Sequence, residues 1–408
     1  MMINRRQFLA TTAATAGALA LPSIRAAQAS EPIKLGSILD VSGIFDAYGK
    51  PMDMAATLAV EELNAGGGLL GRQIQKVSYD TQSDMALYTQ FAQQLVRSDQ
   101  VHVVHGGILS ASREAIRPTL RKAKIPYFYN VLYEGGVCDR NIVCTGITPA
   151  QQIEVLVPAA IEKFGKKVYV LAADYNYGQI TAKWMSHYVS QSGGSVLATE
   201  FFPLDVSDFG ATIAKIQEAK PDLVLSALVG GAHLSFYRQW AAAGMKDRIP
   251  LASSTLGSGN EHLVLTPQEG NGIMVAYSWS PSIDAPAAKA FLDKWKARFG
   301  DVATINEFAV NNYQGIHLWA EAVKKANTVD HDPVIEALES GLAIDGPSGK
   351  VTIDPQTHHA VLDMQLMEIR DQSLAVIKSF SQRQPIDTQK FCDLKANPDD
   401  NKQYEIDI

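Results

Sequence analysis

Short apolar strands and amphipathic helices alternate along most of this sequence, from residue 33 to residue 277. The expected strands are almost continuous apolar runs such as Lys167–Ala172, without the polar alternation of a half-exposed sheet. Continuous runs are typical of parallel strands that helices cover on both faces. The pattern starts again near residue 150, so the sequence predicts an α/β fold with two doubly wound parallel-sheet lobes.

The expected strands fall into two runs and a late group. The first run is Ile33–Leu39, Ile74–Tyr79, Val101–Val104 and Pro126–Tyr129; the second is Lys167–Ala172, Val196–Phe201, Leu223–Ala227, Ile249–Ala252 and Gly272–Tyr277; the late strands are Lys350–Ile353, Met364–Ile369 and Leu374–Ile377. Two long helices, Ala285–Phe299 and Glu307–Ala326, precede the late strands. The polar tail 382–408 contains two prolines and is expected to form an irregular wrap or a loose end.

The first 29 residues read as an export signal. Arg5 and Arg6 precede a weakly apolar run, and Ala27-Gln28-Ala29 supplies small residues for cleavage. This pattern predicts the twin-arginine route, with cleavage near Ala29 and a periplasmic location. No cysteine directly follows the cleavage site, and no later stretch reaches the roughly 20 apolar residues of a membrane span, so no direct membrane anchor is expected.

The net charge of the 408-residue chain is −7, and the signal carries three arginines and no acid, so the mature chain carries −7 − 3 = −10. Such an acidic protein is a poor ligand for nucleic acid or an anionic membrane. The chain has three cysteines, Cys138, Cys144 and Cys392. In an oxidising compartment we expect Cys138 and Cys144 to be bridged, with a linkage to Cys392 left open.

The stretch His105–Ala115 carries the first candidate site. It follows the apolar run Val101–Val104, and Gly106 and Gly107 permit a tight turn. Ser110 then occupies a helix N-cap position, with Ala111 and Ser112 beside it. Unpaired N–H groups at a helix start, together with hydroxyls, bind carboxylates and amide oxygens. The alternative is a capped helix start that binds nothing.

Aromatic and hydroxyl groups follow several other strands. They are Tyr48, Tyr129, Tyr133, Tyr175, Tyr177 and the Gly230 turn. Loops at the carboxyl ends of strands in two facing lobes would line one cleft, where tyrosines supply an apolar wall with a polar tip. Each tyrosine taken alone fits equally well as a half-buried packing residue.

Catalytic and cofactor motifs are missing. Gly66–Arg72 lacks the Lys-Ser/Thr of a phosphate loop, and no Gly-x-Ser-x-Gly elbow occurs. His358 and His359 are adjacent, so a strand would point them to opposite faces and a metal is not expected. The sequence therefore predicts neither an enzyme nor a cofactor-binding protein.

Four motifs resemble those of the type I periplasmic substrate-binding proteins of ABC importers. They are Asn64–Arg72, Gly107–Arg113, Asp174–Gly178 and Asp345–Asp354. The resemblance covers nearly all of residues 31–380. Within this family the chain looks most like the urea and short-chain amide receptors, through Ser110–Arg113, Tyr133–Gly135, Asp174-Tyr175, Phe202–Leu204 and Ile353–His359. It departs from the amide-sensing pattern at Ile108 and Val131, where that pattern has Tyr and Thr.

The resemblance implies two lobes, 31–147 plus 278–344 and 148–277 plus 345–381, joined by a three-stranded hinge near Ile147, Tyr277 and Ile344. It implies a receptor that closes over a small polar solute and delivers it to a membrane permease. The expected ligand-binding residues are Tyr48, Ser110, Ala111, Ser112, Tyr129, Tyr133, Tyr175, Tyr177 and Gly230. The alternatives are an amino-acid receptor with Asp174 or Glu261 facing the ammonium, a ligand sensor, and an exported hydrolase or oxidoreductase.

Overall fold

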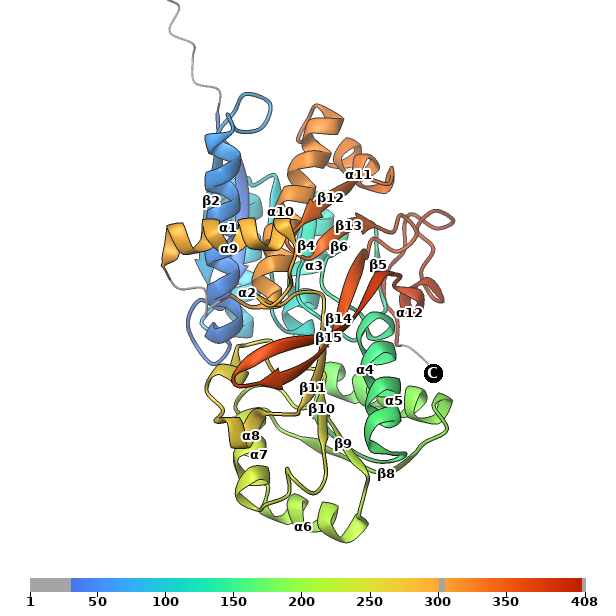
Figure 1. Ribbon diagram of the computed structural model, residues 1–408. Helices are drawn as coiled ribbons and strands as arrows, with labels where there is room; N and C mark the ends of the chain where they lie inside the picture. Colours follow the sequence, from blue (N-terminus) through green and yellow to red (C-terminus); the bar gives the residue numbers. More distant parts are fainter. Residues whose placement is uncertain (1–30, 301–304, 406–408) are drawn as a thin grey trace, which may run out of the picture. The chain divides into compact units, whose positions relative to one another are not determined.

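The computed structural model describes residues 31–300 and 305–405, so the predicted signal 1–29 lies outside the described residues. A first sheet contains five parallel strands in the order β2-β1-β3-β4-β6 (Figure 1). Their bounds are β1 Ile33–Leu39, β2 Ile74–Asp80, β3 Val103–Gly106, β4 Tyr127–Tyr129 and β6 Ile142–Cys144. The predicted strands of the first run are all present, and β6 extends the sheet.

A second sheet follows the order β12-β13-β14-β11-β10-β9-β7-β8, and β15 pairs with β14. Its strands are β7 Lys167–Ala173, β8 Ser195–Phe202, β9 Leu223–Ala227, β10 Leu251–Ser253, β11 Met274–Tyr277, β12 Ala343–Gly346, β13 Gly349–Ile353, β14 Ala360–Arg370 and β15 Ser373–Arg383. Strands β7 to β11 are parallel, whereas β12 to β15 pair antiparallel. The predicted doubly wound parallel sheets are therefore confirmed, with an antiparallel extension built from the late strands.

Helices occupy most connections between the parallel strands. In chain order they are α1 Asp46–Ala65, α2 Met85–Gln94 with a π-helical turn Leu95–Asp99, α3 Ser110–Lys122, α4 Pro149–Phe164, α5 Asn176–Gln191, α6 Gly210–Ala219, α7 Gly231–Ala242, a 3₁₀ turn Glu261–Leu263, α8 Pro267–Gly270, α9 Pro286–Phe299, α10 Glu307–Ala326, α11 His331–Glu339 and α12 Ile386–Gln389. Helix α10 packs on α1.

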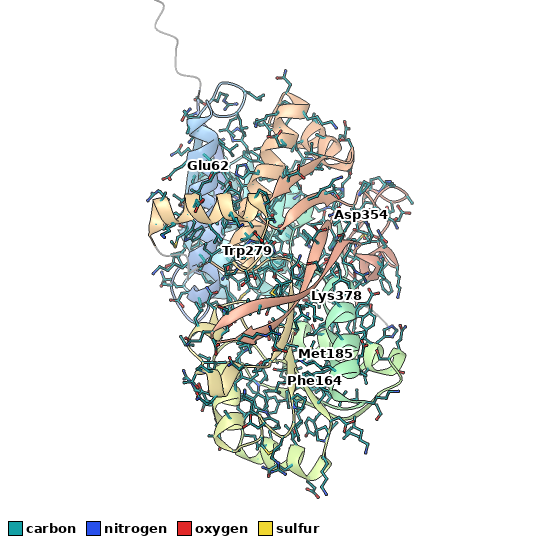
Figure 2. All side chains as sticks on the ribbon, in the orientation of Figure 1. Glu62, Phe164, Met185, Trp279, Asp354 and Lys378 are labelled. Atoms are coloured by element: carbon teal, nitrogen blue, oxygen red, sulfur yellow. A yellow bond between two sulfur atoms is a disulfide. The ribbon has the colours of Figure 1, made fainter. Side chains whose placement is uncertain are left out.

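Apolar spacing explains which faces are buried. In α1 the buried side chains include Met52, Ala55, Ala59 and Leu63, which recur every three or four residues. In β7 every residue except Lys167 is buried, as expected for a strand that is covered on both faces. Side chains fill the space between the sheets and the helices that cover them (Figure 2).

The C-terminal tail forms a wrap. Strand β16 (Asn401–Gln403) pairs antiparallel with β5 (Val137–Asp139), and a disulfide joins Cys138 to Cys392 with their Cα atoms 5.3 Å apart. The predicted Cys138–Cys144 bridge is therefore wrong. Cys144 lies on β6 and pairs in register with β4, where it is buried and free. Burial raises the pKa of its thiol to about 12.

Candidate functional site

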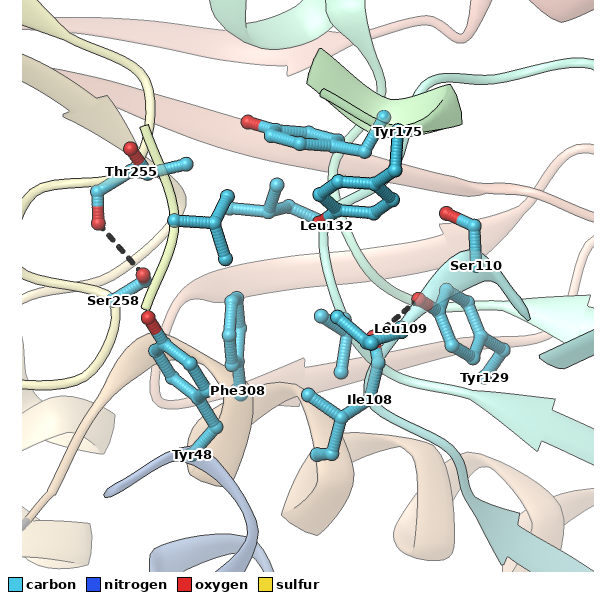
Figure 3. Close-up of a pocket in the computed structure, with 13 residues that line it drawn as sticks. Tyr48, Ile108, Leu109, Ser110, Tyr129, Leu132, Tyr175, Thr255, Ser258 and Phe308 are labelled. Atoms are coloured by element: carbon cyan, nitrogen blue, oxygen red, sulfur yellow. Dashed lines mark hydrogen bonds between the residues drawn. The ribbon is translucent and has the colours of Figure 1, made fainter. Parts of the chain in front are cut away.

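The loops at the carboxyl ends of the parallel strands in both sheets meet around one pocket (Figure 3). Its lining residues are Tyr48, Ile108, Leu109, Ser110, Tyr129, Val131, Leu132, Tyr175, Tyr177, Val229, Thr255, Ser258 and Phe308. The cavity volume is about 30 Å³. No lining residue is charged, so the wall is aromatic, aliphatic and hydroxylic.

A glycine lets the chain turn from β3 into the pocket. Gly106 has a φ of 157°, and a Cβ there would lie 2.1 Å from the carbonyl oxygen of Ile38, so only glycine fits. The hydroxyls of Tyr127 and Tyr129 donate to the carbonyl oxygens of Gly106 and Ile108, at 3.0 and 2.7 Å. These bonds hold the turn against β4.

Helix α3 begins at Ser110, one residue earlier than predicted, so Leu109 occupies the N-cap position. A leucine side chain cannot accept a hydrogen bond, and this helix has no side-chain cap. The first N–H groups of α3 are therefore available where Leu109 and Ser110 line the pocket. The Ser110 hydroxyl does not cap the helix and instead donates a hydrogen bond to Glu134.

Glu134 forms a buried ion pair with Arg113. Ser110 Oγ donates to Glu134 Oε2 at 2.5 Å, and Arg113 Nη2 donates to Glu134 Oε1 at 3.2 Å. The side chains of Glu134 and Arg113 are at most 1% exposed. Arg113 also lies over the rings of Tyr129 and Tyr133, at 5.1 and 4.5 Å from their centroids. Burial lowers the pKa of Arg113, but the surrounding acidic groups, Glu134 foremost, together outweigh burial, and the pKa is raised.

Four other lining hydroxyls also donate to acceptors of the protein. Tyr48 donates to Glu261 Oε1 at 3.1 Å, and Tyr129 to the Ile108 carbonyl at 2.7 Å. Thr255 and Ser258 donate to the carbonyl oxygens of Leu228 and Thr255, at 2.6 and 2.7 Å. Figure 3 draws two of these bonds, from Tyr129 to Ile108 and from Ser258 to Thr255. These hydroxyls keep only their lone pairs free.

The structure brings together five of the nine predicted ligand-binding residues: Tyr48, Ser110, Tyr129, Tyr175 and Tyr177 all line the pocket. Tyr48 and Tyr177 are buried, and Tyr175 is half-buried with its ring 6.1 Å from that of Tyr177. Tyr177 shares a hydrogen bond with Ser254 at 3.1 Å.

The other four predicted residues do not line the pocket. Ala111 is exposed. Ser112 is buried and donates to the Leu109 carbonyl at 2.7 Å, which uses its hydroxyl within the turn. Tyr133 hydrogen bonds to His359 and packs under Arg113. Gly230 is the N-cap of α7, with a φ of 70°, and only its neighbour Val229 reaches the pocket.

Eight lining residues are not among the predicted binding residues, although the resemblance marks positions 108 and 131: they are Ile108, Leu109, Val131, Leu132, Val229, Thr255, Ser258 and Phe308. Most of these side chains are apolar, so their residue type gives no sign of a binding role. Their place directly after a strand is the sequence signal that indicates it. Thr255 and Ser258 follow β10, where the rule that predicted the other loops would have found them. Phe308 is in the first turn of α10, far from any strand end, and its ring lies 5.7 Å from that of Tyr48.

The periplasmic binding protein family model matches residues 32–373, and a twin-arginine translocation signal model matches residues 2–22. The chain belongs to the periplasmic binding protein family. As a member of this family it is a solute-binding receptor of an ABC transporter rather than an enzyme, and its signal directs it to the periplasm. No described helix is both long and apolar enough to span a membrane.

Relatives of this periplasmic binding protein include Leu/Ile/Val-binding protein homolog 6 of Brucella melitensis, 24% identical over 86% of this chain and 91% of the relative. A solute-binding protein of Rhodopseudomonas palustris, solved with 3,4-dihydroxybenzoic acid, is 26% identical, with a TM-score of 0.78 over 87% of this chain and 99% of that chain. A branched-chain amino acid binding protein of Streptococcus pneumoniae, solved with isoleucine, is 24% identical, with a TM-score of 0.76 over 85% and 100% of the two chains.

Within the described residues, no group of three or more His, Cys, Asp and Glu side chains could hold a metal ion. The two acids that are candidates to face the ammonium group of an amino-acid ligand, Asp174 and Glu261, have other partners. Asp174 is exposed and accepts from Gln179 at 2.8 Å. Glu261 accepts from Tyr48 and from the N–H groups of Gly257 and Gly259, and neither acid lines the pocket.

Proposed function

We propose that this protein is the periplasmic receptor of an ABC importer for urea or a short-chain amide, which it delivers to the membrane permease. The observation that carries the proposal is the direction of five of the seven lining hydroxyls, those of Tyr48, Ser110, Tyr129, Thr255 and Ser258. The oxygens that accept these hydrogen bonds belong to backbone carbonyls and to the carboxylates of Glu134 and Glu261. Carbonyls and ionised carboxylates only accept hydrogen bonds, so these protons point away from the pocket.

A wall of oxygen lone pairs favours a ligand that is rich in N–H donors. The amide of acetamide carries two donors and urea carries four, whereas a carboxylate carries none. The pocket also has donors for one acceptor oxygen of the ligand. These are the uncapped N–H groups at the start of α3, where Ser110 lines the pocket. An amide therefore fits with its carbonyl oxygen on α3 and its NH₂ group among the hydroxyls.

Charge and size support the same ligand class. No lining side chain carries a charge, and an unpaired ion is costly to bury, which favours a neutral solute. The cavity volume of about 30 Å³ compares with about 150 Å³ for an engineered protein cavity that binds benzene. A solute of a few heavy atoms suits this space better than a benzoate or isoleucine.

A second candidate ligand is a branched-chain amino acid. The uncapped start of α3 favours it, since those N–H groups would also bind a carboxylate. The Leu/Ile/Val-binding relatives point in the same direction. Against it, the pocket offers no free acid for the ammonium group.

A thermal shift screen of the mature protein tests the proposal. The panel contains urea, formamide, acetamide, propionamide, isoleucine and 4-hydroxybenzoate. A ligand that binds only the folded state raises the melting temperature, by an amount that grows with its concentration relative to Kd. We expect urea or an amide to give the largest shift. A larger shift with isoleucine or 4-hydroxybenzoate, and none with the amides, would contradict the proposal.

We further propose that residues 31–147 plus 278–344 and residues 148–277 plus 345–381 form two lobes that close over the solute. The pocket supports this, because it draws lining residues from the strand ends of both sheets. Ligand binding should shift an open–closed equilibrium. Small-angle scattering with a saturating ligand should give a smaller radius of gyration than without. An unchanged radius, with binding shown by calorimetry, would contradict closure.

A further inference from the structure

Three arginines on one face of α3 bind the C-terminal tail. Arg113, Arg117 and Arg121 recur every four residues, so they share a helix face. Arg117 Nη1 donates to the Asn401 carbonyl at 2.7 Å, and Arg121 donates to the carbonyls of Asp399 and Asp400 at 3.0 Å. Helix α3 is therefore tied along its length to the tail.

Gln403 is the tail residue nearest to the ligand-binding end of α3. Its Oε1 accepts from Arg113 Nη2 at 2.7 Å, and its Nε2 donates to the Gly135 carbonyl at 2.8 Å. Gly135 is the neighbour of Glu134, so one side chain contacts Arg113 and the backbone next to Glu134. Strand β16 and the Cys138–Cys392 disulfide hold Gln403 there. Figure 1 shows α12, the tail helix, in the region of β5.

A continuous chain of hydrogen bonds links Gln403 to the pocket. It runs from Gln403 through Arg113 to Glu134, and from Glu134 to the Ser110 hydroxyl. Arg113 Nη1 has no hydrogen-bond partner among the described residues, so the guanidinium is oriented by the Nη2 contacts and by the bond from Nε to Glu114 at 3.0 Å. Without Gln403, Arg113 would lose its shortest hydrogen bond.

We propose that Gln403 is a positioning residue for solute binding. By fixing Arg113 and the backbone beside Glu134, it holds that carboxylate where it accepts the hydrogen bond from the Ser110 hydroxyl. The lone pairs of Ser110 are then kept toward the solute. The C-terminal tail then contributes to solute binding through Gln403, in addition to packing on the surface of α3. This inference rests on the proposed function, because it assumes that the solute contacts Ser110.

A double-mutant cycle tests the proposal with the panel solute that binds the parent most tightly, whichever it is. Gln403→Ala should weaken binding about three- to tenfold, as expected for the loss of one buried hydrogen bond that acts through its neighbours. In a Ser110→Ala background it should have no further effect, because the residue through which it acts is gone. Lys402→Ala is the matched control, since Lys402 is exposed on the same strand and should leave affinity unchanged.

Hydrogen exchange without ligand separates this proposal from the proposed function. The amides of residues 108–112 should exchange faster in Gln403→Ala than in the parent or Lys402→Ala. Faster exchange supports positioning even if no panel solute binds, in which case only the proposed function fails. Exchange equal to the parent's would overturn the role of Gln403. An equal loss of affinity in the Ser110 and Ser110→Ala backgrounds would also overturn it, because it would indicate a general structural effect.

Discussion

Arg113→Met is expected to lower the free energy of unfolding by about 3–5 kcal/mol, because it leaves Glu134 as a buried charge without its partner. Arg113 is fully buried and Glu134 nearly so, so solvent cannot take over the role of the guanidinium. The substitution also removes hydrogen bonds to Glu114 and Gln403 and the contacts with two tyrosine rings. Unfolding in guanidinium chloride measures the loss; urea is unsuitable because it is a candidate ligand.

Two variants separate the charge from the packing. Arg113→Met combined with Glu134→Gln removes both charges and should recover at least half of the lost stability. Arg121→Met is the matched single variant on the same helix face. Its partner Asp139 keeps a second arginine, Arg117, and the Arg121 side chain is 29% exposed, so the loss should be about 1 kcal/mol or less. Similar losses for Arg113→Met and Arg121→Met would contradict the importance of the buried pair.

Local pattern was enough to predict most of the fold. The apolar runs and the three- and four-residue spacing report burial directly, so the parallel strands and the two long helices α9 and α10 were predicted close to their observed bounds. The rule that parallel strands end at a common edge then located Tyr48, Ser110, Tyr129, Tyr175 and Tyr177 at one pocket. Helix α3 differed by one residue, which changes the role of Ser110 from helix cap to pocket hydroxyl.

Contacts between distant segments could not be predicted. Cys138 and Cys392 are separated by 254 residues, and only the pairing of β16 with β5 brings them together. Cys144 is nearer to Cys138 in sequence, but it lies in the buried strand β6, in register with β4, and is not bonded to Cys138. Phe308 reaches the pocket because α10 packs on α1, again through tertiary packing. The hydroxyl directions likewise depend on partners such as Glu261, 213 residues from Tyr48.

Acetamide is expected to bind at least about 100-fold more tightly than acetate, since the two have nearly the same shape but acetate has a second acceptor oxygen where acetamide has an NH₂ donor group. Acetate would place an acceptor oxygen against the lone pairs of the hydroxyls that donate to the protein, and it would bring a charge into a pocket without a charged side chain. A site built for a donor rejects a ligand that lacks it, because each unmet partner costs about 1–3 kcal/mol.

Ser110→Ala should weaken acetamide binding about ten- to hundredfold and affect acetate little.

Isothermal titration of the mature protein at pH 7 with acetamide and with acetate is the most direct test of the donor-accepting pocket. The control is Lys402→Ala, which should match the parent for both solutes. Binding of acetamide with no detectable binding of acetate is the predicted result. Binding of acetate as tightly as acetamide, or more tightly, would show that the lining hydroxyls donate to the ligand and would contradict the proposed solute class.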